Sequence, residues 1–264
     1  MLSQRIASAV VLLVLLIPAG YLGGWWYFGF IAAFGTVALW ELRGLIAHAG
    51  MRAWEPILFG VPFLLALGAM LPQWDLARPT VAAGVIGASA WQLSRRPEDR
   101  SLPDWAMTIA AAMYVGWLGA QVVFVRAVPN GLAWSIFLYA VILLTDTAAY
   151  FGGRAFGRHQ FTPTISPKKT WEGAIIGWAF GGLFAIGLAR FLQLPMSLAA
   201  ALALGLATSL VSTIGDLTFS FFKRQAHVKD SSHLIPGHGG FLDRLDSVLT
   251  GAAVVATYIV WFVR

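Results

Sequence analysis

Long apolar runs separated by short polar segments are the dominant pattern along this chain of 264 residues. A helix needs about 20 mostly apolar residues to cross the hydrocarbon core of a bilayer. Nine runs approach that length, so the pattern predicts an all-α integral membrane protein, a polytopic helical bundle of about nine transmembrane helices. The predicted spans are Ile6–Gly23, Trp25–Ile46, Ile57–Leu71, Ala77–Leu93, Trp105–Phe124, Leu132–Gly152, Trp171–Phe191, Leu198–Phe222 and Ser247–Val263.

The composition agrees with a membrane protein. Hydrophobic residues make up 58% of the chain and charged residues 11%, whereas an average soluble domain carries roughly 25% charged residues. Too few charges are present to cover a soluble globule of this size, and the same counts exclude a disordered chain. The absence of cysteine excludes disulfides, thiol catalysis, iron–sulfur clusters and thiolate zinc sites.

The distribution of basic residues predicts an orientation. The chain has 18 Lys and Arg against 12 Asp and Glu, which in a membrane protein indicates basic cytoplasmic loops rather than nucleic-acid binding. If the nine spans alternate, 14 of the 18 basic residues fall on one side. Lys and Arg favour the cytoplasmic side. We therefore expect a cytoplasmic N-terminus, an inner-membrane location and a site on the cytoplasmic face.

The polar residues divide the chain into two parts. Residues 1–130 are predicted to be N-terminal transmembrane helices that act as a scaffold, with possible lipid or dimer contacts. Residues 131–264 are predicted to be the catalytic transmembrane region, because polar residues concentrate in its two cytoplasmic loops, 152–170 and 223–246.

The first part of the chain offers little chemistry. Glu41, Arg43 and Glu55 lie near predicted span ends, where snorkelling of a long side chain to the interface explains them. The segment Ser94–Asp104 is predicted to be a solvated connector.

Carboxylates point to a metal centre in the second part. Asp146 and Asp216 lie inside predicted spans, where a charge costs a few kcal/mol and usually faces a bundle interior or an aqueous cavity. Asp243 and Asp246 are three residues apart and share one face of a helix. Two alternatives remain. Asp146 and Asp216 could be structural partners of an Arg or a hydroxyl, and Asp243 and Asp246 could cap the start of a helix. Convergence of Asp216, Asp243 and Asp246 favours a Mg²⁺ site, because hard oxygen ligands suit this ion.

Cations and glycines surround these acids in the sequence. Gly237, His238, Gly239 and Gly240 precede the last helix, where backbone N–H groups approach an anion closely; His238 is a weaker ligand candidate, and Thr170 is a plausible N-cap. The basic residues near the same face are Lys168, Lys169, Lys223, Arg224, Lys229 and Arg244. A carboxylate–metal centre with a cationic rim suits phosphoryl or nucleotidyl transfer, which needs charge neutralisation and alignment.

The second part also carries a recognisable motif. The segment from Ser220 through Lys223, Arg224 and Lys229 to Asp246, with its Pro-Gly-His-Gly-Gly run, resembles the signature of the phosphatidate cytidylyltransferase (CDP-diacylglycerol synthase) family. Residues 166–173 and 146–154 resemble two further blocks of that family. The resemblance runs from about Asp146 to Asp246, whereas the first 130 residues match only in being hydrophobic spans.

This resemblance implies a nucleotidyltransferase that makes CDP-diacylglycerol and pyrophosphate from CTP and phosphatidate with Mg²⁺, in a homodimer. It implies Asp216, Asp243 and Asp246 as metal ligands, with a second ion such as K⁺ as a further candidate. Lys168 and Lys169 would join them as catalytic residues that neutralise phosphates. The implied substrate-binding residues are Ser166, Ser220, Lys223, Arg224, Lys229, Asp230, Gly237, His238, Gly239, Gly240, Arg244 and Asp146.

Two other functions remain open at this point. A membrane prenyltransferase also holds a lipid pyrophosphate through Mg²⁺ and Asp, although such enzymes usually need two Asp-rich helices. A cation-coupled transporter also places Asp inside spans. Against transport, the ionisable residues gather on one side and no inverted repeat is visible.

Overall fold

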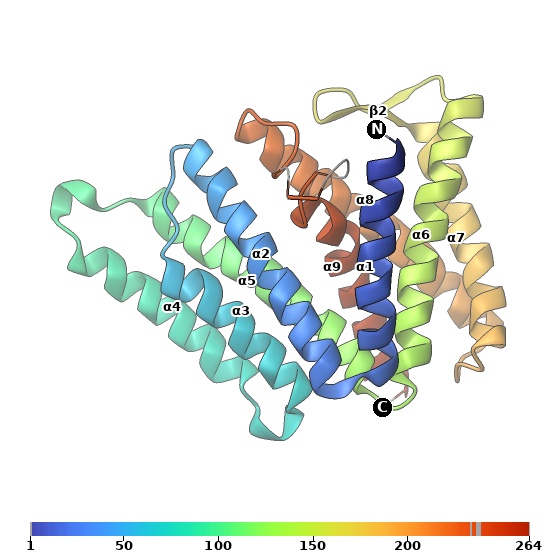
Figure 1. Cartoon of the computed structure of the whole chain (residues 1–264), viewed down its shortest axis with the longest axis horizontal. Helices are drawn as coiled ribbons and strands as arrows, with labels where there is room; N and C mark the ends of the chain where they lie inside the picture. The colour runs from blue at the N-terminus through green and yellow to red at the C-terminus, as the bar shows by residue number, and fades with distance from the viewer. Residues whose placement is uncertain (1, 233, 236–238, 264) are drawn as a thin grey trace. The chain divides into compact units, whose positions relative to one another are not determined.

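The computed structural model describes residues 2–232, 234–235 and 239–263, and most of them are helical (Figure 1). The α-helices are α1 (Leu2–Leu22), α2 (Gly24–His48), α3 (Glu55–Met70), α4 (Ala77–Ser94), α5 (Leu102–Ala127), α6 (Gly131–Phe156), α7 (Trp171–Phe191), α8 (Leu198–Gln225) and α9 (Leu242–Tyr258). The shorter elements are 3₁₀ turns at Pro72–Trp74 and Pro97–Asp99, a π-helical end at Ile259–Val263, and strands β1 (Gln160–Thr162) and β2 (Ser166–Thr170).

Each predicted apolar run lies on one helix to within a residue, except that the last run continues from α9 into the π-helical end. The prediction of an all-α membrane protein is therefore confirmed in its coarse form. Within the described residues, six helices are long and apolar enough to cross a bilayer: α2, α5, α6, α7, α8, and α9 with its π-helical end. Helix α3 is apolar but has 16 residues. These lengths and compositions are those of a multi-pass membrane protein.

The chain divides into two compact units. The first comprises Met1–Ala127 and Phe222–Arg244, and the second comprises Val128–Phe221 and Leu245–Arg264. Helices α8 and α9 therefore contribute residues to both units.

Two contacts organise the first unit. Helices α3 and α5 pack together through buried aliphatic side chains, among them Leu65 and Ala112. Arg126, at the end of α5, donates from Nε to the carbonyl oxygen of Gly20 (2.7 Å) and from Nη2 to that of Tyr21 (3.2 Å). These carbonyls lie in the last turn of α1, where a helix leaves its acceptors without internal partners. Arg126 therefore joins the ends of two helices distant in sequence.

The predicted solvated connector Ser94–Asp104 departs from that prediction at its last residue, which lies in the first turn of α5. Asp104 is only 6% exposed. Its carboxylate accepts from the backbone N–H of Arg52 (2.9 Å) and from Nη1 of Arg95 (3.2 Å). A buried carboxylate needs such partners, so this residue fastens the segment and the loop after α2 to one point.

Helices α6 and α7 pack closely in the second unit because α7 presents small residues to α6. Gly173 and Gly177 are buried one turn apart. A Cβ atom at Gly177 would lie 2.8 Å from the Cβ of Ala149 and 2.9 Å from the carbonyl oxygen of Thr145. Small residues at this spacing let two helix backbones approach, as is common between membrane helices. The buried hydroxyls of Thr145 and Ser209, 2.7 Å apart, join α6 to α8.

The predicted loop 152–170 has more regular structure than expected. Helix α6 continues through Phe156, and β1 and β2 then form an antiparallel hairpin in which Thr162 pairs with Ser166 and Gln160 with Thr170. β-Branched residues and the extended conformation before Pro favour strands here. The predicted N-cap at Thr170 is confirmed, since its Oγ1 accepts from the N–H of Gly173 (3.2 Å).

We expect Gly177→Ala to lower the thermal stability of the detergent-solubilised protein. Overpacking a close helix contact costs roughly 1–3 kcal/mol, which exceeds the helix-propensity gain of about 1 kcal/mol. Gly187→Ala on the same helix is the matched control, because a Cβ atom there meets nothing within 4 Å. A melting temperature that rises equally in both variants would contradict the packing described here.

Candidate active site

A cavity of about 640 Å³ lies within the second unit and gathers several of the predicted residues. Asp146, Lys168, Lys169 and Asp216, singled out from the sequence, all line it. The full lining is Asp146, Ala149, Tyr150, Gly153, Arg154, Phe161, Lys168, Lys169, Thr170, Gly173, Ala174, Thr213 and Asp216. The cavity therefore brings three cations and two carboxylates from α6, α8 and β2 together.

One face of α6 supplies a large part of this lining. Asp146, Ala149, Tyr150, Gly153 and Arg154 follow the spacing of residues that share a face of an α-helix. The sequence-based site set contains Asp146 but omits Tyr150 and Arg154. The helical spacing from Asp146 was the signal that would have included both.

An ion pair between β2 and α8 lies at the cavity. The Nζ of Lys169 donates to Oδ2 of Asp216 at 2.5 Å, and both side chains are about one-third exposed, at 29% and 32%. The neighbouring Lys168 is exposed. Solvent access leaves the pair able to exchange partners, because an ion pair that water reaches contributes little net stability. An anionic ligand in the cavity would compete with Asp216 for the Lys169 ammonium.

Glu172, in the first turn of α7, fastens the base of the hairpin. Its Oε2 accepts from the backbone N–H groups of Arg158 (3.1 Å) and His159 (3.2 Å), and Oε1 lies 2.5 Å from Nδ1 of His159. The N–H of Trp171 donates to the carbonyl oxygen of His159 (2.9 Å). Glu172 thereby fixes the start of the segment that carries Lys168 and Lys169. This role of Glu172 was not predicted from the sequence.

Helices α8 and α9 approach closely beside Asp216. A Cβ atom at Gly215 would lie 2.5 Å from the carbonyl oxygen of Asp246. Because Gly215 has no side chain, the backbone of Asp246 can lie next to the turn of α8 that carries Asp216. Asp246 itself is 8% exposed, and its Oδ1 accepts from the N–H of Ser247 (2.6 Å).

A second polar cluster, in the first unit, surrounds Asp243. Its Oδ1 accepts from Nζ of Lys223 at 2.5 Å, in an ion pair whose side chains are 9% and 14% exposed. Its Oδ2 accepts from the N–H of Gly240 (3.0 Å) and from both the N–H (3.2 Å) and the hydroxyl (3.0 Å) of Ser231. Lys223 and Gly240, both selected from the motif, therefore each bind Asp243.

Glu41 belongs to the same cluster, and the snorkelling interpretation of this residue is wrong. The side chain is 2% exposed rather than at an interface. Its carboxylate accepts from the hydroxyls of Ser231 and Ser232 and from the backbone N–H groups of Phe241 and Leu242. Arg43 and Glu55 do form an exposed ion pair at 2.7 Å, as expected of residues at span ends.

The other predicted residues differ in their exposure. Ser166 on β2 and Ser220 on α8 are half-buried. Arg224, Lys229, Asp230 and Arg244 are exposed. Gly239 adopts a positive φ of 79° that favours glycine. Gly237 and His238 lie outside the described residues.

No group of three His, Asp or Glu side chains within residues 2–232, 234–235 and 239–263 is arranged to hold a metal ion. Asp216 and Asp243 each bind a lysine ammonium instead. The assignment of Asp216, Asp243 and Asp246 as metal ligands therefore stays a prediction.

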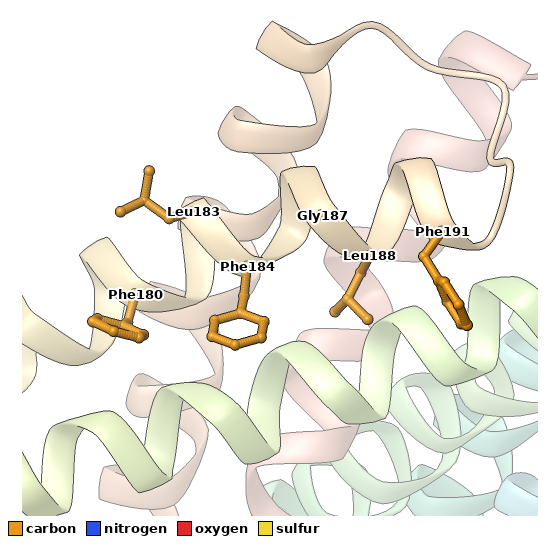
Figure 2. A pocket seen from close by; sticks show the side chains of 6 residues that line it. All are labelled: Phe180, Leu183, Phe184, Gly187, Leu188 and Phe191. Carbon is orange, nitrogen blue, oxygen red and sulfur yellow. The ribbon is translucent and has the colours of Figure 1, made fainter.

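A separate hollow of about 440 Å³ on α7 is apolar (Figure 2). Phe180, Phe184, Leu188 and Phe191 project from the same side of the helix, as Figure 2 shows. Its lining contains no charged residue, so it offers no groups for the chemistry of the cavity.

Comparison with known proteins decides the family. The model of the cytidylyltransferase family matches residues 3–262, which is nearly the whole chain. The chain belongs to the cytidylyltransferase family. This cytidylyltransferase is therefore matched over its N-terminal helices as well as over the motif in its second half.

Relatives of this cytidylyltransferase share the name phosphatidate cytidylyltransferase. The protein of Brucella suis is 34% identical over 255 residues, which cover 96% of this chain and 92% of the relative. The Haemophilus influenzae protein is 32% identical over 299 residues, covering all of both chains. The chloroplastic phosphatidate cytidylyltransferase 4 of Arabidopsis thaliana is 45% identical over 129 residues, covering 49% of this chain and 33% of the relative.

We expect Glu172→Ala to release the base of the hairpin. The variant removes the acceptor of two backbone N–H groups, so amide hydrogen exchange at Arg158 and His159 should accelerate. Mass-spectrometric exchange on the solubilised protein measures this. Glu98→Ala, at an exposed position of the first unit, is the control and should leave those amides unchanged. Equal protection in both variants would remove the role given to Glu172.

Proposed function

We propose that this chain is a phosphatidate cytidylyltransferase, which transfers CMP from CTP to phosphatidate and gives CDP-diacylglycerol and pyrophosphate. The observation that carries the proposal is a cavity with three cations and two carboxylates in a chain matched over nearly its whole length by this family. The names of the near-full-length relatives support the same substrates. No observation of the structure favours a transporter or a prenyltransferase.

The reaction needs no covalent intermediate on the protein. An oxygen of the phosphatidate phosphate forms a bond to the α-phosphorus of CTP, while the bond from that phosphorus to the bridging oxygen breaks. The electron pair leaves with pyrophosphate. Lys168, Lys169 and Arg154 line the cavity and would neutralise the phosphates of the two substrates, which otherwise repel each other. Positioning and charge neutralisation thus supply the catalysis.

The acids fit a divalent cation by their chemistry. Asp216, Asp243 and Asp246 offer carboxylate oxygens, the ligands that Mg²⁺ prefers, and Asp216 lines the cavity, where its Oδ2 accepts from the Lys169 ammonium. We assign these three residues as the ligands, with K⁺ as a candidate second ion. When bound, Mg²⁺ would offset the charge that develops on the phosphate oxygens. The close approach at Gly215 supports the pairing of Asp216 with Asp246.

The remaining motif residues complete the binding surface in this proposal. Ser166, Ser220 and Asp146 would orient the substrates by hydrogen bonds. The glycines at 237, 239 and 240 would present backbone N–H groups to pyrophosphate, although the N–H of Gly240 is directed at Asp243 in this structure. The other residues with a substrate-binding role are Lys223, Arg224, Lys229, Asp230, His238 and Arg244.

We also propose how the chain lies in its membrane. All nine helices would cross or enter the inner membrane, with the N-terminus and the loops 152–170 and 223–246 on the cytoplasmic side, where CTP is present. The excess of Lys and Arg in those loops supports this orientation. The acyl chains of phosphatidate would enter laterally between helices. A homodimer is the expected assembly.

Labelled CTP, phosphatidate and Mg²⁺ added to the purified protein test the activity directly. We expect the cytidine label in the lipid extract, together with an equal amount of released pyrophosphate. Label that remains entirely in the aqueous phase would contradict the proposal. Cation flux in sealed vesicles without transfer would instead favour transport.

We expect Asp246→Asn to lower turnover by roughly 100-fold or more, because it removes one charge from the ligands of an ion that contributes several kcal/mol of charge stabilisation. The variant should remain folded, since Asn has nearly the same shape. Asp99→Asn, at an exposed site between α4 and α5, is the matched control. Near-normal turnover of Asp246→Asn in the same assay would refute its assignment as a ligand.

A further inference from the structure

We propose that Glu41 is a positioning residue that sets the cation affinity of Asp243 through Ser231. This inference rests on the proposed function, because it takes Asp243 as a ligand of the divalent cation. Glu41 lies on α2, 190 residues from Ser231, in the part of the chain that the sequence analysis treated as a scaffold. All the contacts that support the proposal lie within the first unit.

Both oxygens of Glu41 are used to hold the segment that leads into α9. Oε2 accepts from the hydroxyl of Ser231 (2.9 Å) and from the N–H of Leu242 (2.8 Å). Oε1 accepts from the N–H of Phe241 (3.0 Å) and from the hydroxyl of Ser232. The first backbone N–H groups of a helix have no partner inside it. Glu41 therefore caps the start of α9 from a position on α2.

The same segment presents Asp243. The Ser231 hydroxyl lies 2.9 Å from Glu41 and 3.0 Å from Oδ2 of Asp243, so the two carboxylates share one donor whose single hydrogen reaches either of them. Gly240, whose N–H donates to Asp243, precedes the Phe241 amide that Glu41 binds. The orientation of Asp243 therefore depends on Glu41 by two routes, the Ser231 hydroxyl and the backbone of Gly240 and Phe241.

The segment around Gly240 packs closely against Glu41 and α2. A Cβ atom at Gly240 would lie 2.5 Å and 2.6 Å from the two oxygens of Glu41. The ring of Phe241 packs edge-to-face on Phe34 of α2, with centroids 4.8 Å apart. The segment is therefore held against α2 by the Glu41 carboxylate and by the aromatic contact with Phe34. Loss of either contact would move Asp243. Partners that orient a metal ligand typically change metal affinity by about 10–100-fold when removed.

The decisive variant is Glu41→Gln, tested on the full-length protein in detergent. The amide is nearly isosteric, but it replaces one acceptor oxygen by an NH₂ group that faces N–H and O–H donors. We expect Mn²⁺ alone, titrated by electron paramagnetic resonance, to bind about 10-fold more weakly. The Mg²⁺ concentration for half-maximal cytidylyl transfer should rise by a similar factor, and exchange of the Phe241 and Leu242 amides should accelerate.

Glu55→Gln is the matched control, because Glu55 is a carboxylate of the same unit in an exposed ion pair. It should leave Mn²⁺ affinity, Mg²⁺ activation and amide exchange unchanged. Faster exchange in Glu41→Gln with unchanged Mn²⁺ affinity would show a purely structural cap and overturn the proposal. An inactive wild-type protein would instead refute the proposed function, and a wild-type protein that transfers CMP without binding Mn²⁺ would overturn this inference alone.

Ser232→Ala provides a second route should Glu41→Gln fail to fold. Ser232 donates to Glu41, and its hydroxyl also accepts from the N–H of Leu234 (3.1 Å), but no bond joins it to Asp243 among the described contacts. Loss of one neutral hydrogen-bond partner should weaken Mn²⁺ binding by about threefold. An unchanged Mn²⁺ affinity in this variant, with the Phe241 amide exchanging faster, would overturn the proposal as well.

Discussion

A carboxylate that leaves water for a bundle of apolar helices costs several kcal/mol unless donors or cations meet it there. This constraint governs how the polar segments of the chain are placed. Asp104 binds Arg95 and the backbone of Arg52, Asp216 binds Lys169, and Asp243 binds Lys223. In each case the acid and its partner belong to different elements, so satisfying one charge also fastens one segment to another. These acids therefore hold elements of the structure together, and Asp216 and Asp243 are candidate ligands as well.

The two polar clusters differ in what their surroundings allow. Asp216 and Lys169 are about one-third exposed and face a cavity, so water and anions reach the pair and its partners can change. Lys223 and Asp243 are far less exposed and are surrounded by hydrogen bonds that the protein itself supplies. The first arrangement suits a surface that must take up and release a charged substrate. The second suits a carboxylate whose orientation has to stay constant.

The sequence predicted the parts of this structure that depend on local pattern. Nine apolar runs coincide with nine helices among the described residues, and Thr170 caps α7, because length, polarity and capping act within a few residues. The prediction that Glu41 snorkels to the membrane interface was wrong for a physical reason. A carboxylate near a span end looks the same whether it reaches water or a serine 190 positions away, and only tertiary packing decides between them. The β1–β2 hairpin was not predicted, because strands of three and five residues are too short to show an alternating pattern of polar and apolar residues.

The hydroxyl of Ser231 lies within reach of two acids but carries a single hydrogen. Rotation about one C–O bond therefore directs that hydrogen to α2 or to the start of α9 without displacing any heavier atom. Whichever acid loses it keeps its other donors, Lys223 and Gly240 for one and the Phe241 and Leu242 amides for the other. The serine hydroxyl therefore has two orientations, which differ only in the position of one hydrogen atom.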